Sequence, residues 1–385
     1  MHVVVLGAGY AGVTLTRKLE QSLPAEATLT LVDESDSHLV QHEVHRAIRR
    51  PSITDSIQVS LDSLFDRAAV RTAHIEYVDT DANRVTLADG ETLSYDYGAL
   101  CLGAKTAFYD LPGVEKFGFP LKSVSDAEAI RERALDVIES GEPATFVVGG
   151  AGLSGVQVAG ELATLAVEQD ADDRIKVVVL EQLDSVAPAF REAFQRAVAD
   201  ELIARGIEVR TETSVVEATE STIETDHAGA RRSIEYDLFV WTGGIAGSDA
   251  LGGDRPVVRN DLRLTPTTFA LGDAARVVDT DGEAVPASAS AAIRAAKPVA
   301  QNITTLVNWE LTGGEAFEPR LTPFRFDVPG WIVSVGDGAV AQVGPTVVTG
   351  TAAKGLKASV GVGYLSSISA VRKATELVGE ELSGG

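Results

Sequence analysis

Two stretches of the chain share one pattern of apolar positions: a short β-branched run, a helical segment and a second apolar run. The three segments are 2–6, 10–22 and 28–32 in the first stretch and 144–148, 155–168 and 176–180 in the second. Each second run ends on a carboxylate, Asp33 or Glu181. Continuous apolar strands that alternate with helices are typical of buried parallel sheets. The pattern therefore predicts two strand–helix–strand units, one in each of two nucleotide-binding domains.

Weaker patterns fill the rest of the chain. The predicted segments are antiparallel strands over 75–93, strands over 206–236, helices over 126–140 and 191–205, and a glycine-rich tail from 324 with strands to about 348 and helix after 353. The alternation of strands and helices predicts the α/β class.

A glycine motif opens the helix of each strand–helix–strand unit. The motifs are Gly7-Ala8-Gly9-Tyr10-Ala11-Gly12 and Gly150-Ala151-Gly152-Leu153-Ser154-Gly155. Both follow the G-x-G-x-x-G pattern, which lets the backbone turn tightly and approach a pyrophosphate at a helix N-terminus. Asp33 follows Gly12 by 21 residues and Glu181 follows Gly155 by 26, where a carboxylate can bind a ribose hydroxyl. Two motifs predict two dinucleotides, and Glu181 favours NAD over NADP because a carboxylate repels a 2′-phosphate.

Composition restricts the partners and the redox chemistry. The net charge is −23 with 45% hydrophobic residues, which indicates a folded protein suited to a high-salt cytoplasm. Such an acidic surface argues against nucleic-acid binding. Cys101 is the single cysteine, so a disulfide framework, a cysteine-based zinc site and a dithiol redox centre are all excluded. The sequence contains neither a membrane-spanning apolar run nor a signal peptide, and we expect a cytoplasmic protein.

A third signature, Thr268-Phe269-Ala270-Leu271-Gly272-Asp273, places a carboxylate directly after a strand and a glycine. Here the chain resembles the two-dinucleotide-binding flavoproteins of the pyridine nucleotide–disulfide reductase superfamily. The resemblance implies that Gly272 and Asp273 hold the ribityl and pyrophosphate part of FAD. It also implies that the first glycine motif binds FAD and the second binds NADH.

The closer resemblance is to type II NADH dehydrogenases, the single-subunit NADH:quinone oxidoreductases. The similar stretches are Leu31–Asp33 with His38–Gln41, Tyr95–Gly113, Gly155–Leu162, Val240–Gly244 and Pro286–Ala292. The fold implied is two Rossmann-like domains, with the FAD domain split in sequence, the NAD domain inserted into it and a C-terminal β/α region. The expected segments are 1–115 and 241–323 for FAD, 116–240 for NADH and 324–385 for contact with a membrane or a second subunit.

The resemblance also implies the site residues, residue by residue. Those for FAD are Gly7, Gly9, Tyr10, Ala11, Gly12, Asp33, Glu34, His38, Gln41, Gly103, Gly272, Asp273, Ser290 and Ala291. Those for NADH are Gly150, Gly152, Leu153, Ser154, Gly155, Glu181 and Gly243. The candidate catalytic residues are Gln157, where the family usually has a glutamate, and Ser290, where a glutamine usually lines the quinone pocket. Glutamine keeps hydrogen bonds but does not ionise, so proton transfer at Gln157 and quinone use at Ser290 are both open questions.

Three histidines, His38, His42 and His45, lie within eight positions. Metal binding is conceivable at that spacing, but Glu43 offers the only nearby carboxylate, so we expect no metal site and individually bonded or solvent-facing rings. Cys101 is expected to be a small buried residue.

The tail has an unusual charge distribution, because the 38 residues between Asp337 and Glu376 contain no acid. They contain Lys354, Lys357, Arg372 and Lys373, with Val360, Tyr364, Leu365, Ile368 and Val371 at roughly helical spacing. One interpretation is an interfacial helix on anionic lipid at the cytoplasmic face of the cell membrane. The other is a helix packed on the protein or in a homodimer interface.

Three functions remain open at this point. The first is NADH oxidation through FAD with a quinone as acceptor. The second is a soluble flavoprotein reductase for a ferredoxin- or rubredoxin-type carrier, and the third is a redox-sensing or interaction protein without turnover.

Overall fold

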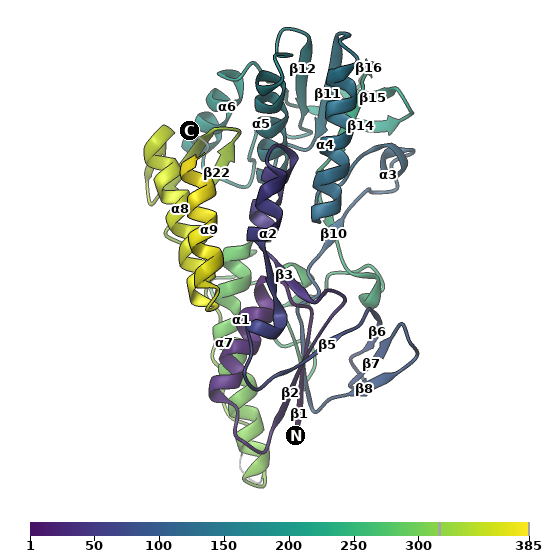
Figure 1. The fold of residues 1–385 in the computed structure, drawn as a ribbon. Helices are drawn as coiled ribbons and strands as arrows, with labels where there is room; N and C mark the ends of the chain where they lie inside the picture. The colour runs from purple at the N-terminus through teal and green to yellow at the C-terminus, as the bar shows by residue number, and fades with distance from the viewer. Residues whose placement is uncertain (315–316, 384–385) are drawn as a thin grey trace.

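The first of two parallel sheets contains five strands in the order β20–β9–β1–β2–β5. These strands are β1 (His2–Leu6), β2 (Thr28–Asp33), β5 (Ala69–Thr72), β9 (Tyr97–Leu100) and β20 (Thr268–Ala270). The protein is described by a computed structural model that covers residues 1–314 and 317–383. Helices α1 (Tyr10–Ser22) and α7 (Ala289–Leu311) pack against each other beside this sheet (Figure 1). Strand β20 joins the sheet from far along the chain, so the first domain is split in sequence as predicted.

The second parallel sheet is built from the middle of the chain. Its order is β13–β12–β11–β17. Its strands are β11 (Ala144–Gly149), β12 (Ile175–Leu180), β13 (Glu208–Arg210) and β17 (Leu238–Trp241), and its helices are α4 (Val124–Glu139), α5 (Leu153–Glu168) and α6 (Glu192–Ile203). Phe146, Val147 and Val148 of β11 are fully buried, which is why apolar residues follow one another there without alternating with polar ones.

The two crossings between the sheets lie side by side. Strand β10 (Lys105–Thr106) pairs antiparallel with β18 (Ile245–Ala246), where the chain leaves the first sheet and where it returns. This pairing agrees with an inserted second domain, while the exact segment limits given above stay a prediction. The fold class of two Rossmann-like units within an α/β chain is confirmed.

Smaller elements complete the body. The antiparallel sheets are β6 (Ile75–Asp79), β7 (Arg84–Leu87) and β8 (Thr92–Ser94), and β14 (Thr213–Ala218), β15 (Thr222–His227) and β16 (Ala230–Glu235). The short elements are β3 (Ser37–Leu39), β4 (Gln58–Ser60), β19 (Val257–Val258), β21 (Arg276–Val277), α2 (Thr54–Ile57), α3 (Val114–Phe117) and the 3₁₀ helices η1 (Gln41–Ile48), η2 (Pro51–Ile53), η3 (Leu61–Ser63), η4 (Asp249–Leu251) and η5 (Gly272–Ala274).

Several predicted helix starts were late: α4 begins at Val124 and not at 126, α8 (Gly350–Ser367) begins at Gly350 and not after 353, and α5 shows the reason most clearly. Helix α5 begins at Leu153 and not at Gly155. Gly152 has extended backbone angles and is the N-cap, so the helix starts directly after the second glycine of the motif.

The tail forms a three-stranded antiparallel sheet followed by two helices. Its elements are β22 (Gly330–Val335), β23 (Gly338–Val343), β24 (Thr346–Thr349), α8 (Gly350–Ser367) and α9 (Val371–Ser383). The hairpin turn approaches α5 closely, because a Cβ added at Gly160 would lie 2.3 Å from the Gly336 nitrogen. In Figure 1 the tail helices, in yellow, run alongside the body of the molecule. The tail is therefore an integral part of the packed structure.

Most of the apolar stripe of the tail packs on the protein, in agreement with the second of the two interpretations above. Tyr364, Leu365 and Ile368 are buried, and Lys357 is only 9% exposed, whereas Val360 and Val371 are exposed. Apolar residues at helical spacing face the protein core here because the tail packs on the first domain and on α5. Within the described residues, none of the helices is both long and apolar enough to cross a bilayer.

Candidate active site

The first glycine motif forms the tight turn between β1 and α1. Gly7 has φ +100°, and a Cβ there would lie 2.4 Å from the Cys101 carbonyl oxygen. A Cβ on Gly12 would lie 1.7 Å from the Gly7 carbonyl oxygen. By contrast, a Cβ on Gly9 would meet no atom within 4 Å. Gly7 and Gly12 are thus required by the protein backbone, while the space beside Gly9 is open to a ligand.

The second motif repeats this division of roles between β11 and α5. Gly150 has φ +97°, with the Thr242 carbonyl oxygen 2.9 Å from an added Cβ. A Cβ on Gly155 would lie 1.9 Å from the Gly150 carbonyl oxygen, and one on Gly152 would again meet nothing within 4 Å. The two sites are therefore built alike, with open space at the second glycine, where a dinucleotide phosphate approaches the helix N-terminus.

The two acidic strand ends also occupy equivalent positions. Asp33 Oδ2 accepts a hydrogen bond from the Ala8 nitrogen at 2.5 Å, and Glu181 Oε2 accepts one from the Ala151 nitrogen at 2.8 Å. The second oxygen of each bonds the backbone two residues on, at Ser35 and Leu183. Each carboxylate consequently lies against its glycine loop.

A cavity of about 1280 Å³ opens beside the first loop. Six of the residues predicted to bind FAD line it: Gly7, Gly9, Asp33, Glu34, Gln41 and Gly103. Its walls also include the segment from Cys101 to Leu111 and the returning segment from Ile245 to Asp249. The cavity is thus bounded by both crossings between the sheets.

Asp273 is not among the residues that line this cavity, but it lies close to Lys122, a lining residue absent from the sequence prediction. Burial raises the pKa of Asp273, while the positive charges of Lys122 and Arg255 oppose that rise. Lys122 lines the cavity, and its own pKa is lowered by burial. In the sequence, Lys122 stands out only by its position directly before the Ser123–Asp126 capping box, which does not indicate a ligand site.

Seven other predicted FAD residues do not line the cavity. They are Tyr10, Ala11, Gly12, His38, Gly272, Ser290 and Ala291. Gly272 has φ +66°, and a Cβ there would approach the Ala11 Cβ to 3.1 Å, so this glycine allows η5 to pack against α1.

The three histidines are bonded one by one. His38 contacts the Ala8 carbonyl oxygen through Nδ1 and the Tyr364 hydroxyl through Nε2, each at 2.8 Å. His42 contacts the Tyr10 hydroxyl, and His45 contacts Ser334 Oγ at 2.8 Å. Within residues 1–314 and 317–383, no group of three or more His, Cys, Asp or Glu is arranged to hold a metal ion.

Acid is expected to weaken the fold through His38. Burial lowers the pKa of His38 from 6.5 to about 4, so the unfolded chain takes up a proton first as the pH falls. Stability is therefore lost between about pH 6.5 and 4, by about 3 kcal/mol for this group. Burial also lowers the pKa of His42 and His45, so these two histidines likewise favour unfolding as the pH falls. Urea unfolding at several pH values gives the free energy of unfolding as a function of pH, and between about pH 6.5 and 4 this free energy should fall less steeply in His38→Gln than in the wild type. An equally steep fall would exclude His38 as a major contributor to the loss of stability in acid.

The candidate catalytic residue Gln157 faces a buried polar cluster under the tail. Ser334 Oγ accepts hydrogen bonds from Gln157 Nε2 at 3.4 Å and from Lys357 Nζ at 3.2 Å. Lys357 also lies 3.3 Å from Glu43. Burial opposes ionisation of Glu43, but Lys357, His42 and Arg46 together hold its pKa well below the usual range. The chain thus has an ionised carboxylate in this cluster, one that lies on η1 and not on α5.

Ser290 lies in the first turn of α7. Its Oγ accepts a hydrogen bond from Arg294 Nε at 3.2 Å, and the Ala291 nitrogen donates to the N-cap residue Ser288. No hydrogen bond joins Gln157 to Ser290 in the described part of the chain, so the two candidates belong to separate groups.

Comparison with known proteins assigns the family. Residues 1–296 match the model of the pyridine nucleotide-disulphide oxidoreductases, which covers both glycine motifs and the Gly272–Asp273 signature. The chain belongs to this family. Membership confirms an oxidoreductase with FAD and NADH as its expected cofactors.

Individual relatives point to one branch of the family. A type II NADH:quinone oxidoreductase of Staphylococcus aureus is 25% identical over 342 residues, which covers 82% of this chain and 84% of that protein. The structure of NDH2 from Plasmodium falciparum in complex with NADH has a TM-score of 0.84 at 13% identity, with 98% and 97% of the two chains covered. A sulfide:quinone oxidoreductase of Aquifex aeolicus has a TM-score of 0.79 at 17% identity, over 97% and 92%. The two solved structures show a shared fold.

The family name refers to a disulphide, yet this member has one cysteine in its sequence. Cys101 is buried, and burial raises the pKa of its thiol. Because only the thiolate is nucleophilic, burial disfavours a redox role for this residue. We expect Cys101→Ala to oxidise NADH at the wild-type rate, and a rate below one tenth of wild type in a stopped-flow assay would contradict an inert thiol.

Proposed function

We propose that this chain is an FAD-containing NADH dehydrogenase that passes electrons to a quinone without redox cysteines. The observation that carries the proposal is the pair of equivalent glycine loops. Each has open space at its second glycine, and in each a carboxylate accepts a hydrogen bond from the backbone nitrogen that follows the first glycine. Two dinucleotide sites and a single buried thiol leave hydride transfer between a nicotinamide and a flavin as the chemistry that fits.

The residues around the first loop fit FAD. Gly9 leaves room for a pyrophosphate, Asp33 is placed for a ribose, and the cavity of about 1280 Å³ is large enough for an extended dinucleotide. Asp273 and Lys122 lie next to each other at the cavity wall, as a carboxylate and an ammonium that can bond ribityl hydroxyls and phosphate. Bound FAD would supply the acceptor for a hydride and deliver electrons onward.

The second loop would take NADH. Glu181 presents a carboxylate at the strand end, which favours a ribose with a free 2′-hydroxyl over one with a 2′-phosphate. The task of the chain here is positioning, because hydride transfer needs alignment of two rings and no acid or base on the protein.

Quinone reduction additionally requires protons, and Gln157 has no proton to give. Next to it, His45, Ser334 and Lys357 hold exchangeable protons on buried side chains, beside the ionised Glu43. In this proposal the cluster keeps a proton source beside the family's usual glutamate position.

A test begins with the purified protein. We expect a yellow chromophore that bleaches on anaerobic addition of NADH and returns on addition of a soluble quinone. A colourless protein after FAD reconstitution would reject the flavoenzyme, and reoxidation by ferredoxin but by no quinone would favour the soluble reductase. That second candidate draws support from Ser290 in place of a glutamine. Turnover below about one per minute with every acceptor would favour the sensor function.

The setting proposed is the cytoplasm of a high-salt organism, with contact at the inner face of the membrane. The net charge of −23 supports the first part, since dense carboxylates repel one another less when salt screens them. The acid-free residues 338–375 support the second. Activity and folding measured from 0.1 to 4 M salt would test the former.

A further inference from the structure

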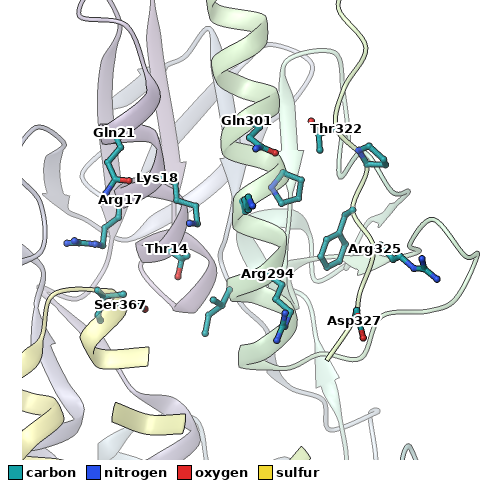
Figure 2. Close-up of a pocket in the computed structure, with 16 residues that line it drawn as sticks. Thr14, Arg17, Lys18, Gln21, Arg294, Gln301, Thr322, Arg325, Asp327 and Ser367 are labelled. Atoms are coloured by element: carbon teal, nitrogen blue, oxygen red, sulfur yellow. The ribbon is translucent and has the colours of Figure 1, made fainter. Parts of the chain in front are cut away.

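A basic groove lies on the side of the molecule formed by α1, α7 and residues 322–327. It has a volume of about 780 Å³. Arg17 and Lys18 of α1, Arg294 of α7 and Arg325 of the loop line it (Figure 2), and so does Lys297 of α7. Asp327 is the one carboxylate in its lining, although the chain as a whole has 56 acidic and 33 basic residues. The groove therefore has the opposite charge balance to the rest of the protein.

The five cations differ in what they bond. Arg17 donates to the Leu64 carbonyl oxygen and to Ser369 Oγ, and Arg294 donates to Ser290 Oγ, all of them neutral acceptors. Arg325 pairs with Asp281. Among residues 1–314 and 317–383, Lys18 and Lys297 have no carboxylate within 4.0 Å.

Unpaired lysines on neighbouring helices repel each other unless an anion lies between them. Lys18 stands on the α1 face that also carries Thr14 and Gln21, and Lys297 stands one turn after Ile293 on α7. In Figure 2 the Lys18 side chain extends from α1 toward α7. The two ammonium groups are thus available to an external anion.

The tail carries exposed apolar surface next to the groove. In the groove wall Ile293 is partly exposed, while Pro298, Phe324 and Ile368 are buried. Val371 follows Ile368 by three residues and is 60% exposed, in the segment that contains no acid. A ligand that joins a phosphate to a hydrocarbon part would match both surfaces.

We propose that the groove binds the phosphate of an anionic lipid headgroup, with Lys18 and Lys297 as its direct contacts. The proposal deepens the proposed function, because an enzyme that reduces a quinone dissolved in lipid has to sit on the lipid surface. A free phosphate ester would use the cations but leave the exposed apolar tail surface uncovered. An acidic carrier protein would cover roughly 800 Å² of surface and extend over the acidic residues outside the groove.

The test compares Lys18→Gln/Lys297→Gln with a control that removes two positive charges elsewhere, Lys116→Gln/Lys176→Gln. Flotation is measured with vesicles of phosphatidylcholine alone and with 30% phosphatidylglycerol, at the lowest salt at which circular dichroism shows a folded protein. We expect the wild type and the control to bind only the anionic vesicles. The groove variant should bind them about 30-fold more weakly, from the typical effect of about 1 kcal/mol for each lysine at an anionic surface.

Four results would overturn the inference. They are equal binding to both kinds of vesicle, equal loss in the control variant, release of the wild type by millimolar inorganic phosphate, and lysine-dependent binding of an acidic ferredoxin in place of vesicles. Reduction of a short-chain soluble quinone is measured in parallel. If the groove variant keeps that activity but leaves the vesicles, both proposals stand; if the wild type binds vesicles but reduces no quinone, only the proposed function fails.

Discussion

Replacing Arg49 by methionine is expected to lower the free energy of unfolding by about 3 to 5 kcal/mol, as for other broken buried ion pairs. The Arg49 guanidinium lies 2.8 Å from Glu161, 2.7 Å from Glu168 and 2.8 Å from Asp337. These carboxylates belong to α5 and to the turn after β22, while Arg49 follows η1. Without Arg49, Glu161 would either stay charged without its bonded partner or take up a proton, and both cost stability, since burial already raises its pKa against the opposing effect of the arginine. Urea unfolding followed by circular dichroism gives the measurement.

Two further variants separate this ion pair from general packing. Arg49→Met/Glu161→Gln removes both buried charges and should recover part of the lost stability, since no unpaired charge remains. Glu168→Gln removes a half-exposed partner and should cost less than about 1 kcal/mol. A loss below about 1 kcal/mol in Arg49→Met itself would show that water reaches Glu161.

Gly9→Ala is expected to impair FAD binding, whereas Gly12→Ala is expected to impair folding. At Gly12 the new Cβ would lie 1.7 Å from the Gly7 carbonyl oxygen, so α1 cannot seat on β1 and the protein should misfold or lose more than about 3 kcal/mol of stability. At Gly9 the Cβ meets no protein atom within 4 Å, so the apoprotein should keep its stability. The methyl group would instead occupy space for the pyrophosphate, and FAD binding should weaken at least about tenfold. Thermal unfolding and titration of apoprotein with FAD measure the two effects.

The second loop provides the matched control. Gly152→Ala should raise the KM for NADH and leave the FAD content unchanged, whereas Gly155→Ala should destabilise the fold, with its Cβ 1.9 Å from the Gly150 carbonyl oxygen. Loss of FAD in Gly152→Ala, or normal NADH kinetics in it, would contradict the assignment of the first loop to FAD and the second to NADH.

Local patterns were sufficient for most of the two nucleotide-binding units. The strands at 2–6 and 144–148 are buried on both faces, so their residues are apolar without interruption and easy to recognise. The glycine motifs were equally visible, because backbone turns and close approaches require glycine at fixed spacing. The helix start at Leu153 was missed because the pattern does not distinguish an N-cap glycine from a glycine inside the first turn.

Lys122 and Arg49 show what local patterns omit. Lys122 lines the cavity beside the first glycine loop and lies near Asp273, and Arg49 bonds Glu161 and Asp337, which are far away in sequence. Nothing in the neighbouring sequence marks either residue, because its partners come together only when separate segments pack.

Short segments of the sequence were enough to predict the two glycine loops, the acids that follow them and the single thiol. These features depend on backbone geometry and residue type within a few positions, which a sequence displays directly. The packing of the tail could be found only from the fold, since apolar spacing fits a lipid surface and a protein core equally well. Lys357 and Tyr364 lie buried against Glu43 and His38, which places most of that stripe inside the protein, and the basic surface that remains open lies between α1 and α7.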